Sequence, residues 1–363
     1  MRILLIGRFY EEGFASHIAA ELGALGHTVV HFDPGPKLMA FGSRARFYAN
    51  RLIGVGHQAV QNLSRALGRS DLGERLDKAV AAHGPIDLTL SIHDYLTAED
   101  AARVKRATRA PLALWFPDPV WTFGRHMFLN APYDALLFKD PYIVDLLRRK
   151  LGKPVYYMPE CYSPLSLDPS RVGTVGDSRY ACDVTTAGNL YAYRVAILEQ
   201  VAAHHDLKVW GLPAPRWMAI GDLKPCLQNR FVAHDEKVRA FRGAKIVLNT
   251  HNPAEISGTN VRTFEACGAG AFQITDAKAG LADLFAIGKE LVTFDRLDDL
   301  MDKLTYYLEH PELRQTIAEA GYARARRDHT YAVRLGQLLD TVDGRSSGYP
   351  LPALDGESPR AVV

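Results

Sequence analysis

The stretch "ISGTNVRTFEACGAGAFQITD" combines residue types that together could bind a nucleotide. Thr259 or Asn260 can cap a helix that begins directly behind the Gly-Thr-Asn turn, and the N-terminal dipole of that helix favours phosphate. Arg262 follows in the first helical turn, where its planar guanidinium could hold two phosphate oxygens. Glu265 falls on the same helix face, and its carboxylate could accept the hydroxyl protons of a ribose. The pattern predicts a nucleoside diphosphate site formed by Gly258, Thr259, Asn260, Arg262 and Glu265.

An exposed Arg–Glu pair on an ordinary surface helix is the structural alternative to this site. A second turn supports the nucleotide interpretation. In "CDVTTAGNLYAYR" an apolar strand ends in small residues, and a helix follows the turn at Gly188 and Asn189. Backbone N–H groups of such a turn can face an anion, and Arg194 lies about one turn into the helix. We therefore expect Gly188, Asn189 and Arg194 to contribute to the same donor-binding edge.

Polar residues that could act on an acceptor follow the strands of the first half of the chain. His93 and Asp94 come directly after "DLTLSI", and Asp118 lies between two prolines in "WFPDPVW". A general base for an acceptor hydroxyl needs such a position, so these three residues are the catalytic candidates. The alternatives are a histidine that packs or caps a helix and a purely structural aspartate. Gly7 and Tyr10, in the loop after the first strand, are the candidates for acceptor binding.

Two kinds of cofactor chemistry are disfavoured. The first loop, "GRFYEEG", lacks the G-x-G-x-x-G pattern that places a dinucleotide on a helix N-terminus, which argues against a dehydrogenase. No D-x-D pair follows a strand in a metal-binding arrangement, and the four cysteines include no C-x-x-C pair. We expect no cofactor and no catalytic metal ion.

Short apolar runs that alternate with helical stretches must position these residues. The pattern predicts two doubly wound α/β domains with parallel sheets, and ligands of such sheets bind beyond the carboxyl ends of the strands. Between Pro154 and Asp177 the composition shifts to Pro, Ser, Gly and Asp, which indicates a linker. The expected organisation begins with an acceptor-side Rossmann-like domain at residues 1–165 and a nucleotide-sugar-binding Rossmann-like domain at residues 166–325. A helix at residues 326–342 is expected to pack back toward the first domain, and residues 343–363 are expected to form a flexible tail.

Bulk composition agrees with this organisation. The 363 residues correspond to roughly two domains of about 150 residues each. A formal net charge of +2 with interleaved acidic and basic residues gives no basic face for nucleic acid or for a membrane surface. The N-terminal apolar run is too short for a signal peptide, and no apolar run is long enough to cross a membrane. We therefore expect a cytoplasmic protein that contains reduced cysteines.

The second half of the chain resembles a known family, the CgeB-like glycosyltransferases of the GT-B fold, also called the spore maturation protein type. The resemblance implies two Rossmann-like domains that face each other across a cleft, and a metal-independent hexosyltransferase (EC 2.4) that uses a nucleotide sugar such as a UDP-sugar. It runs from "NVRTFEACGAGAFQITD" to the terminal "HTYAVR" and is carried by Asn249, Gly258, Asn260, Arg262, Phe264, Glu265, Gly270, Asp276, Gly288 and Glu290.

One motif of the wider GT-B class is only half present. In that class the second Glu of an E-x7-E motif holds the ribose, and the resemblance assigns this role to Glu265. The first Glu would fall on Ser257, while Glu255 is close but out of register. The sequence therefore leaves open how the transferred sugar is held, and with it retention or inversion at the anomeric carbon.

The resulting hypothesis is a glycosyltransferase that moves a sugar from a nucleotide diphosphate sugar to an acceptor hydroxyl on a glycan, a protein or a small molecule. Two alternatives remain. A nucleotide-sugar epimerase on the same fold would need no acceptor, and a non-catalytic protein that binds sugar nucleotides would perform no chemistry. The identities of the sugar, the nucleotide and the acceptor, and the oligomeric state, stay open.

Overall fold

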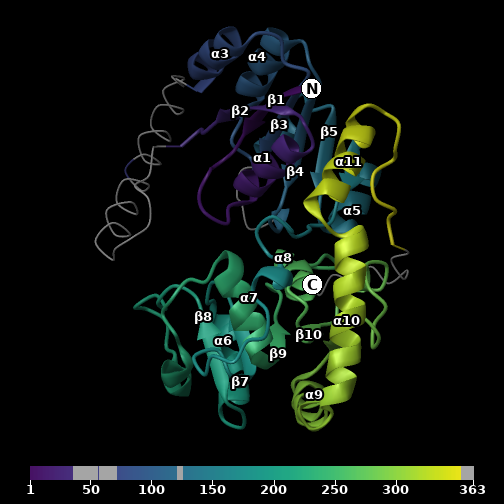
Figure 1. Ribbon diagram of the computed structural model, residues 1–363. Helices are drawn as coiled ribbons and strands as arrows, with labels where there is room; N and C mark the ends of the chain where they lie inside the picture. The colour runs from purple at the N-terminus through teal and green to yellow at the C-terminus, as the bar shows by residue number, and fades with distance from the viewer. Residues whose placement is uncertain (36–55, 57–71, 121–125, 353–363) are drawn as a thin grey trace. The chain divides into compact units, whose positions relative to one another are not determined.

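The computed structural model describes residues 1–35, 56, 72–120 and 126–352, and its contacts divide the chain into two compact units. Each unit is built around its own parallel sheet (Figure 1). The contact division differs in detail from the domain boundaries expected from the sequence, because residues 139–145 group with the C-terminal unit. Residues 335–348, from the last helix onward, group with the N-terminal unit. Most of the expected flexible tail, residues 353–363, lies outside the described residues.

The N-terminal unit contains a parallel sheet of six strands in its described part, ordered β2-β1-β3-β4-β5-β6. Nearly all side chains of the inner strands are buried, as expected where helices cover both faces of a parallel sheet. The strands are β1 (Arg2–Ile6), β2 (Thr28–Phe32), β3 (Leu88–Ile92), β4 (Leu112–Phe116), β5 (Ala135–Phe138) and β6 (Val155–Tyr157).

Five of these strands were expected, but the linker interpretation of residues 154–177 is wrong. Strand β6 lies within this segment and pairs with β5, and Tyr157 and Met158 are completely buried. Proline and serine gave the segment the composition of a linker, although its aromatic residues pack as a core. The described helices that connect the strands of this sheet are α1 (Phe14–Ala24), α3 (Leu72–His83), α4 (Ala98–Thr108) and α5 (Pro141–Leu151).

The C-terminal unit contains a five-stranded parallel sheet, ordered β11-β10-β9-β7-β8 in the described residues. The chain starts this sheet at β7, adds β8 on one side and then places β9 on the other side. The switch in direction lies between β7 and β9, which is where ligands of open α/β sheets bind. The strands are β7 (Cys182–Ala187), β8 (Leu207–Trp210), β9 (Ala244–Asn249), β10 (Gln273–Asp276) and β11 (Val292–Phe294), all five as expected from the sequence.

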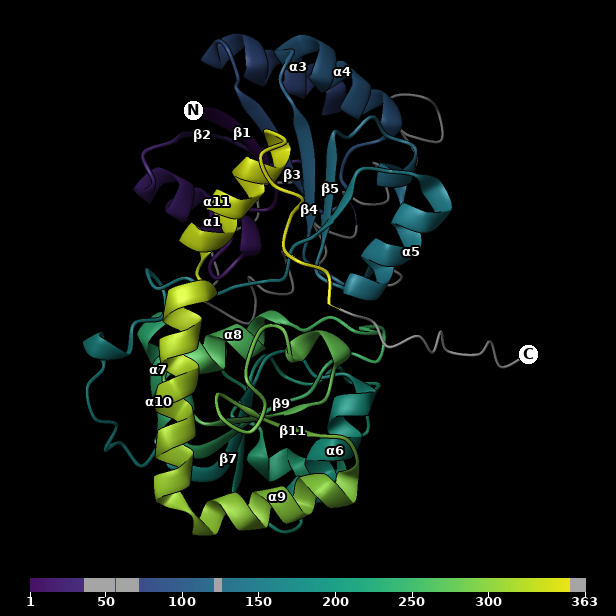
Figure 2. The same cartoon turned by 90° about the vertical axis from the view of Figure 1, so that its right-hand side faces the viewer.

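Helix α8 (Val261–Gly268) follows β9 and is held by close packing. A Cβ atom on Gly268 would collide with the ring of Tyr162, and α10 packs against α8. Figure 2 shows α10 running along the unit while α9 lies across its end. The remaining helices of this half are α6 (Ala192–Ala202), α7 (His234–Gly243), α9 (Leu297–Glu309), α10 (Pro311–Asp328) and α11 (Tyr331–Val342).

Candidate functional site

Arg194 joins the two loops that leave the sheet at the switch between β7 and β9. Its Nη1 donates to the carbonyl of Asn189 at 2.8 Å, in the loop after β7. Its Nε and Nη2 donate to the hydroxyl and the carbonyl of Thr250 at 2.9 and 2.8 Å, directly after β9. Only 4% of Arg194 is exposed, and this burial lowers the pKa of its guanidinium. These contacts tie the two loops together, and the expected contact of Arg194 with the donor stays a prediction.

Gly188 and Arg262 meet at the same edge of the sheet. Gly188 has a φ of 126°, which favours glycine, and a Cβ atom there would lie 2.5 Å from Nη2 of Arg262. The Nε atom of Arg262 is buried and has no hydrogen-bond partner, and no described residue forms an ion pair with this guanidinium. Burial, together with the nearby charge of Arg194, lowers the pKa of Arg262 to about 10. At neutral pH the group is still a cation. Glu265 and Glu160 oppose the lowering of its pKa, but neither forms an ion pair with it among the described residues, so the guanidinium is suited to contact an anionic ligand directly.

Asn260, and not Thr259, is the N-cap of helix α8. Its side-chain oxygen accepts the backbone N–H of Thr263 at 3.3 Å. Its side-chain amide also exchanges hydrogen bonds with the amide of Asn249, at 3.0 Å in both directions. The cap therefore ties the start of α8 to the end of β9, so the position of the helix N-terminus is set by the sheet.

A directed chain of hydrogen bonds supports the turn before α8. Both His251 and Thr259 are buried, and the Nδ1 atom of His251 bonds to the carboxylate of Asp276. Because a carboxylate only accepts, Nδ1 carries the proton, and Nε2 accepts from the hydroxyl of Thr259 at 2.8 Å. The Thr259 oxygen then accepts from Thr263 at 2.6 Å. His251 was not among the expected site residues, although it follows the end of β9 as several of them follow strand ends.

This Thr–His–Asp order is that of a hydrolase triad, but it cannot supply a nucleophile. Thr259 is 1% exposed, and its hydroxyl is engaged by two protein groups. The network instead holds the turn, and any contact of Thr259 with a donor must go through its backbone.

Glu265 pairs with Lys237, which was not among the expected site residues. Its Oε1 lies 2.8 Å from Nζ of Lys237, which comes from α7, and both side chains are about nine-tenths buried. The lysine neutralises the carboxylate that was assigned to the ribose. Glu265 therefore enters any ligand contact as half of an ion pair, oriented before the ligand arrives.

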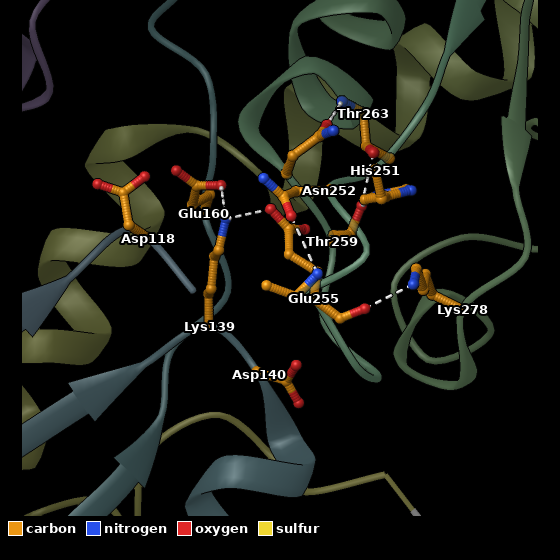
Figure 3. A network of polar contacts seen from close by, with 12 residues as sticks. Asp118, Lys139, Asp140, Glu160, His251, Asn252, Glu255, Thr259, Thr263 and Lys278 are labelled. Carbon is orange, nitrogen blue, oxygen red and sulfur yellow. Dashed lines mark hydrogen bonds and ion pairs between the residues drawn. The ribbon is translucent and has the colours of Figure 1, made fainter. Parts of the chain in front are cut away.

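A second buried cluster of charges includes Glu255, from the loop between β9 and α8, and two residues that follow β5 and β6. Figure 3 shows Lys139 between two carboxylates, those of Glu160 and Glu255. Its Nζ atom is 3.3 Å from Oε2 of Glu160 and 2.9 Å from Oε1 of Glu255. All three side chains are at least 93% buried. The position of Lys139 directly after β5 is a sequence signal of the kind that indicates site residues. The sequence near Lys139 does not indicate that its partners are Glu160 and Glu255.

Residues 139 and 140 also support the turn at Gly258. A Cβ atom on Gly258 would lie 2.6 Å from the carbonyl oxygen of Lys139, so the absence of a side chain there allows a close backbone approach. The carboxylate of Asp140 accepts the Ser257 hydroxyl at 2.6 Å and the backbone N–H groups of Ile256 and Ser257. These contacts lie within the C-terminal unit and fix the loop that leads into α8.

In the N-terminal unit, two of the three catalytic candidates come together. Nε2 of His93 lies 3.4 Å from Oδ2 of Asp118, so the ends of β3 and β4 present a His–Asp pair. His93 has a positive φ of 70°, a conformation that costs energy in a residue with a Cβ atom. Asp94 points elsewhere, because its carboxylate accepts the N–H groups of Met127 and Phe128 at 2.6 and 3.0 Å. It therefore stabilises the start of a short 3-10 helix.

The acceptor-binding candidates have different environments. A Cβ atom on Gly7 would lie 2.7 Å from Cβ of Ala15, so this glycine lets α1 approach the sheet. Tyr10 is 53% exposed. Arg8, next to Gly7, forms an ion pair of 3.1 Å with Asp33 at the end of β2. The carboxyl edge of this sheet is thus polar, with charged groups from several strand ends.

Two further findings concern metals and membranes. Across the described residues, no three His, Cys, Asp or Glu side chains are grouped so that they could hold a metal ion, and the four cysteines are free thiols. No helix in the described part of the chain is long and apolar enough to span a bilayer.

Residues 194–340 match a family described as glycosyl transferase-like. The chain is 26% identical over 248 residues to spore protein CgeB of Bacillus subtilis (strain 168), which covers 63% of this chain and 73% of that protein. One similar solved structure is Anabaena HepE in complex with UDP and glucose, with 14% identity, a TM-score of 0.65 and coverage of 95% of this chain and 100% of that chain. Another is a glycosyltransferase from Rickettsia africae ESF-5, with 12% identity, a TM-score of 0.64 and coverage of 95% and 98% of the two chains. Sucrose-phosphate synthase from Thermosynechococcus elongatus is also similar (12%, 0.61, 95% and 100%).

These likenesses coincide with the site. The matched family begins at Arg194 and includes the loop after β9 and the whole of α8. The similarity to the solved structures extends over both units and shows the fold that the sequence resemblance implied. The chain is therefore similar to spore protein CgeB, has the GT-B fold, and matches the glycosyl transferase-like family at residues 194–340.

Proposed function

We propose that this protein transfers a sugar from a nucleotide diphosphate sugar to an acceptor hydroxyl. The observation that carries the proposal is Arg262, a cation that has no partner among the described residues and lies against Gly188 at the switch point of the C-terminal sheet. A diphosphate supplies negative charge in direct contact with this guanidinium. The complex of HepE with UDP makes UDP the first nucleotide to test.

The nucleotide sugar binds to the N-terminal part of α8. The diphosphate contacts Arg262 and the free backbone N–H groups of the first turn, and the ribose hydroxyls contact Glu265, which Lys237 orients. Negative charge grows on the diphosphate as the glycosidic bond breaks. The guanidinium and backbone N–H groups that already face the diphosphate therefore stabilise the transition state more than the ground state. This charge stabilisation comes from the protein, and the proposed reaction needs no metal ion.

The acceptor is bound by the N-terminal unit. His93, oriented by Asp118, takes the proton of the acceptor hydroxyl, and Tyr10 contributes to acceptor binding. Asp94 holds the backbone at Met127 and Phe128, and a direct part in the reaction is not proposed for it. Alanine at His93 is expected to abolish turnover and leave the affinity for UDP unchanged.

Isothermal titration with UDP tests the donor site. Arg262→Ala should weaken UDP binding by about tenfold or more, since hydrogen bonds to a charged group contribute about 1.5–3 kcal/mol. Arg296→Ala is the matched control, because Arg296 is 78% exposed and should leave the affinity unchanged. NAD should not bind. Equal UDP affinity in wild type and Arg262→Ala, or binding of NAD in place of every nucleoside diphosphate, would refute the assignment.

Product analysis separates a transferase from the alternatives. Incubation of the protein with a nucleotide sugar and candidate acceptors, followed by mass spectrometry, should give a glycosylated acceptor and free nucleoside diphosphate. Turnover should persist in EDTA. Conversion of the donor into an isomer without any acceptor would instead indicate an epimerase, and tight binding without any product would indicate a binding protein.

A further inference from the structure

Two residues of the turn before α8, Gly258 and Thr259, are held by the hydrogen bonds of a single side chain. The residues on either side, Ser257 and Asn260, have partners of their own in the C-terminal unit. Among the described residues, neither Gly258 nor Thr259 forms a backbone hydrogen bond, and glycine has no side chain. The hydroxyl of Thr259 therefore makes all the hydrogen bonds that these two residues form within the described part of the chain.

The backbone N–H groups of this turn are among those that the proposed function assigns to the diphosphate. The N–H groups of residues 258–262 form no hydrogen bond with any residue that the structure describes. Successive N–H groups at the start of a helix favour an anion, and Arg262 belongs to the same segment. Binding of the phosphates therefore depends on how firmly the turn is held in one orientation.

His251 determines the direction in which the Thr259 hydroxyl points. The histidine is completely buried, and Figure 3 shows it beside Thr259. The carboxylate of Asp276, at the end of β10, accepts both its Nδ1–H and its backbone N–H, which leaves Nε2 as an acceptor. The Thr259 hydroxyl donates to this nitrogen at 2.8 Å and accepts from Thr263 at 2.6 Å. These hydrogen bonds connect the end of β10 to the first turn of α8.

We propose that His251 is a positioning residue for the phosphates of the nucleotide sugar. Acting through the hydroxyl of Thr259, it keeps the peptide groups of residues 258–260 in the orientation that the diphosphate requires. The proposal rests on the proposed function, since it gives a task there to a buried side chain that does not touch the substrate. The effect is limited to the phosphates, because Glu265, which faces the ribose in the proposed function, is held separately by Lys237.

The variant Thr259→Val removes the hydroxyl and keeps nearly the same shape. The measurement is the ratio of the dissociation constant of uridine to that of UDP, by isothermal titration with UDP and by displacement of UDP with uridine. This ratio reports the contribution of the diphosphate alone. It should fall about tenfold in Thr259→Val, with uridine binding unchanged, because a misplaced N–H group loses a hydrogen bond to a charged oxygen. His251→Ala should lower the ratio by a similar factor.

Three further variants separate this role from a general loss of structure. Thr275→Val removes another buried hydroxyl of the same sheet, one that bonds to no described residue, and should leave the ratio unchanged. Thr259→Ser loses a buried methyl group but keeps the hydroxyl, so it should lower the free energy of unfolding in urea and still retain most of the ratio. The double variant of His251→Ala and Thr259→Val should lose no more than the larger single loss, because both act through one hydrogen bond. If His251→Ala does not fold, the Thr259 variants still decide the question.

The outcomes separate the two proposals. If the wild type binds no nucleoside diphosphate, the proposed function itself fails; if one binds more tightly than UDP, it and its nucleoside replace this pair of ligands. If the ratio survives in Thr259→Val, the donor site stands and the role of His251 is refuted. Equal losses of uridine and UDP affinity in Thr259→Val, or an equal fall of the ratio in Thr275→Val or Thr259→Ser, would also refute it, because the hydroxyl would then not act on the phosphates.

Discussion

His329 makes the stability of the C-terminal unit sensitive to acid. It lies between α10 and α11 and is completely buried. Nη2 of Arg334 donates to its Nδ1 at 2.7 Å, so the ring proton is on Nε2, which donates to the carbonyl of Leu284 at 2.8 Å. Burial, followed by the charge of Arg334, lowers the pKa of His329 from 6.5 to about 3. The folded protein therefore holds a neutral imidazole throughout the mildly acidic range.

The size of the effect follows from the two pKa values. In the unfolded chain His329 takes up a proton below about pH 6.5, whereas in the folded chain it does so only near pH 3. The unfolded state binds more protons between these values, so the free energy of unfolding falls as the pH falls. At pH 5 the loss from this residue is about 2 kcal/mol relative to pH 7.

Urea denaturation at pH 7 and pH 5 measures this loss. His329→Gln keeps one acceptor for Arg334 and one donor for Leu284 but cannot titrate. We expect its free energy of unfolding to fall between the two pH values by about 2 kcal/mol less than that of the wild type. The control His204→Gln, at an exposed position, should behave like the wild type. An identical acid loss in the wild type and in His329→Gln would refute the reasoning.

Three further changes test individual contacts of the site. Gly188→Ala should weaken UDP binding at least tenfold, because its Cβ atom displaces the guanidinium of Arg262; titration calorimetry measures this. Lys237→Met should lower the free energy of unfolding by about 3–5 kcal/mol in urea, because it leaves Glu265 buried and unpaired. Asn260→Ala should destabilise the protein by about 1 kcal/mol by removing the cap of α8, as measured in the same assay.

Each change has a control or a contradicting result. Gly176→Ala, where a Cβ atom meets nothing within 4 Å, should leave UDP binding intact. Adding Glu265→Leu to Lys237→Met should restore much of the lost stability, since the unpaired charge is then gone. If the double variant is no more stable than the single one, the ion pair is not the cause. An Asn260→Ser variant that is as unstable as Asn260→Ala would contradict the capping role.

The alternation of strands and helices in both units could be predicted from the sequence. Buried parallel strands read as short apolar runs, and ten of the strands are found where those runs lie. Strand β6 was missed because only three residues form it, within a segment rich in proline and serine. The start of α8 could also be predicted from the sequence, since a capping side chain accepts from a backbone N–H only three residues away.

The roles of the individual side chains depended on contacts that only the tertiary structure makes. Arg194 and Arg262 look alike in sequence, as cations near the start of a helix. The fold ties Arg194 into two loops, whereas Arg262 has no hydrogen-bond or ion-pair partner among the residues that the structure describes. Local patterns show which residues lie on a helix, but the order of strands in the sheet decides which loops become neighbours. The partners of Glu265 and Glu255 are lysines from other elements, Lys237 and Lys139, and no spacing along the chain encodes such a pairing.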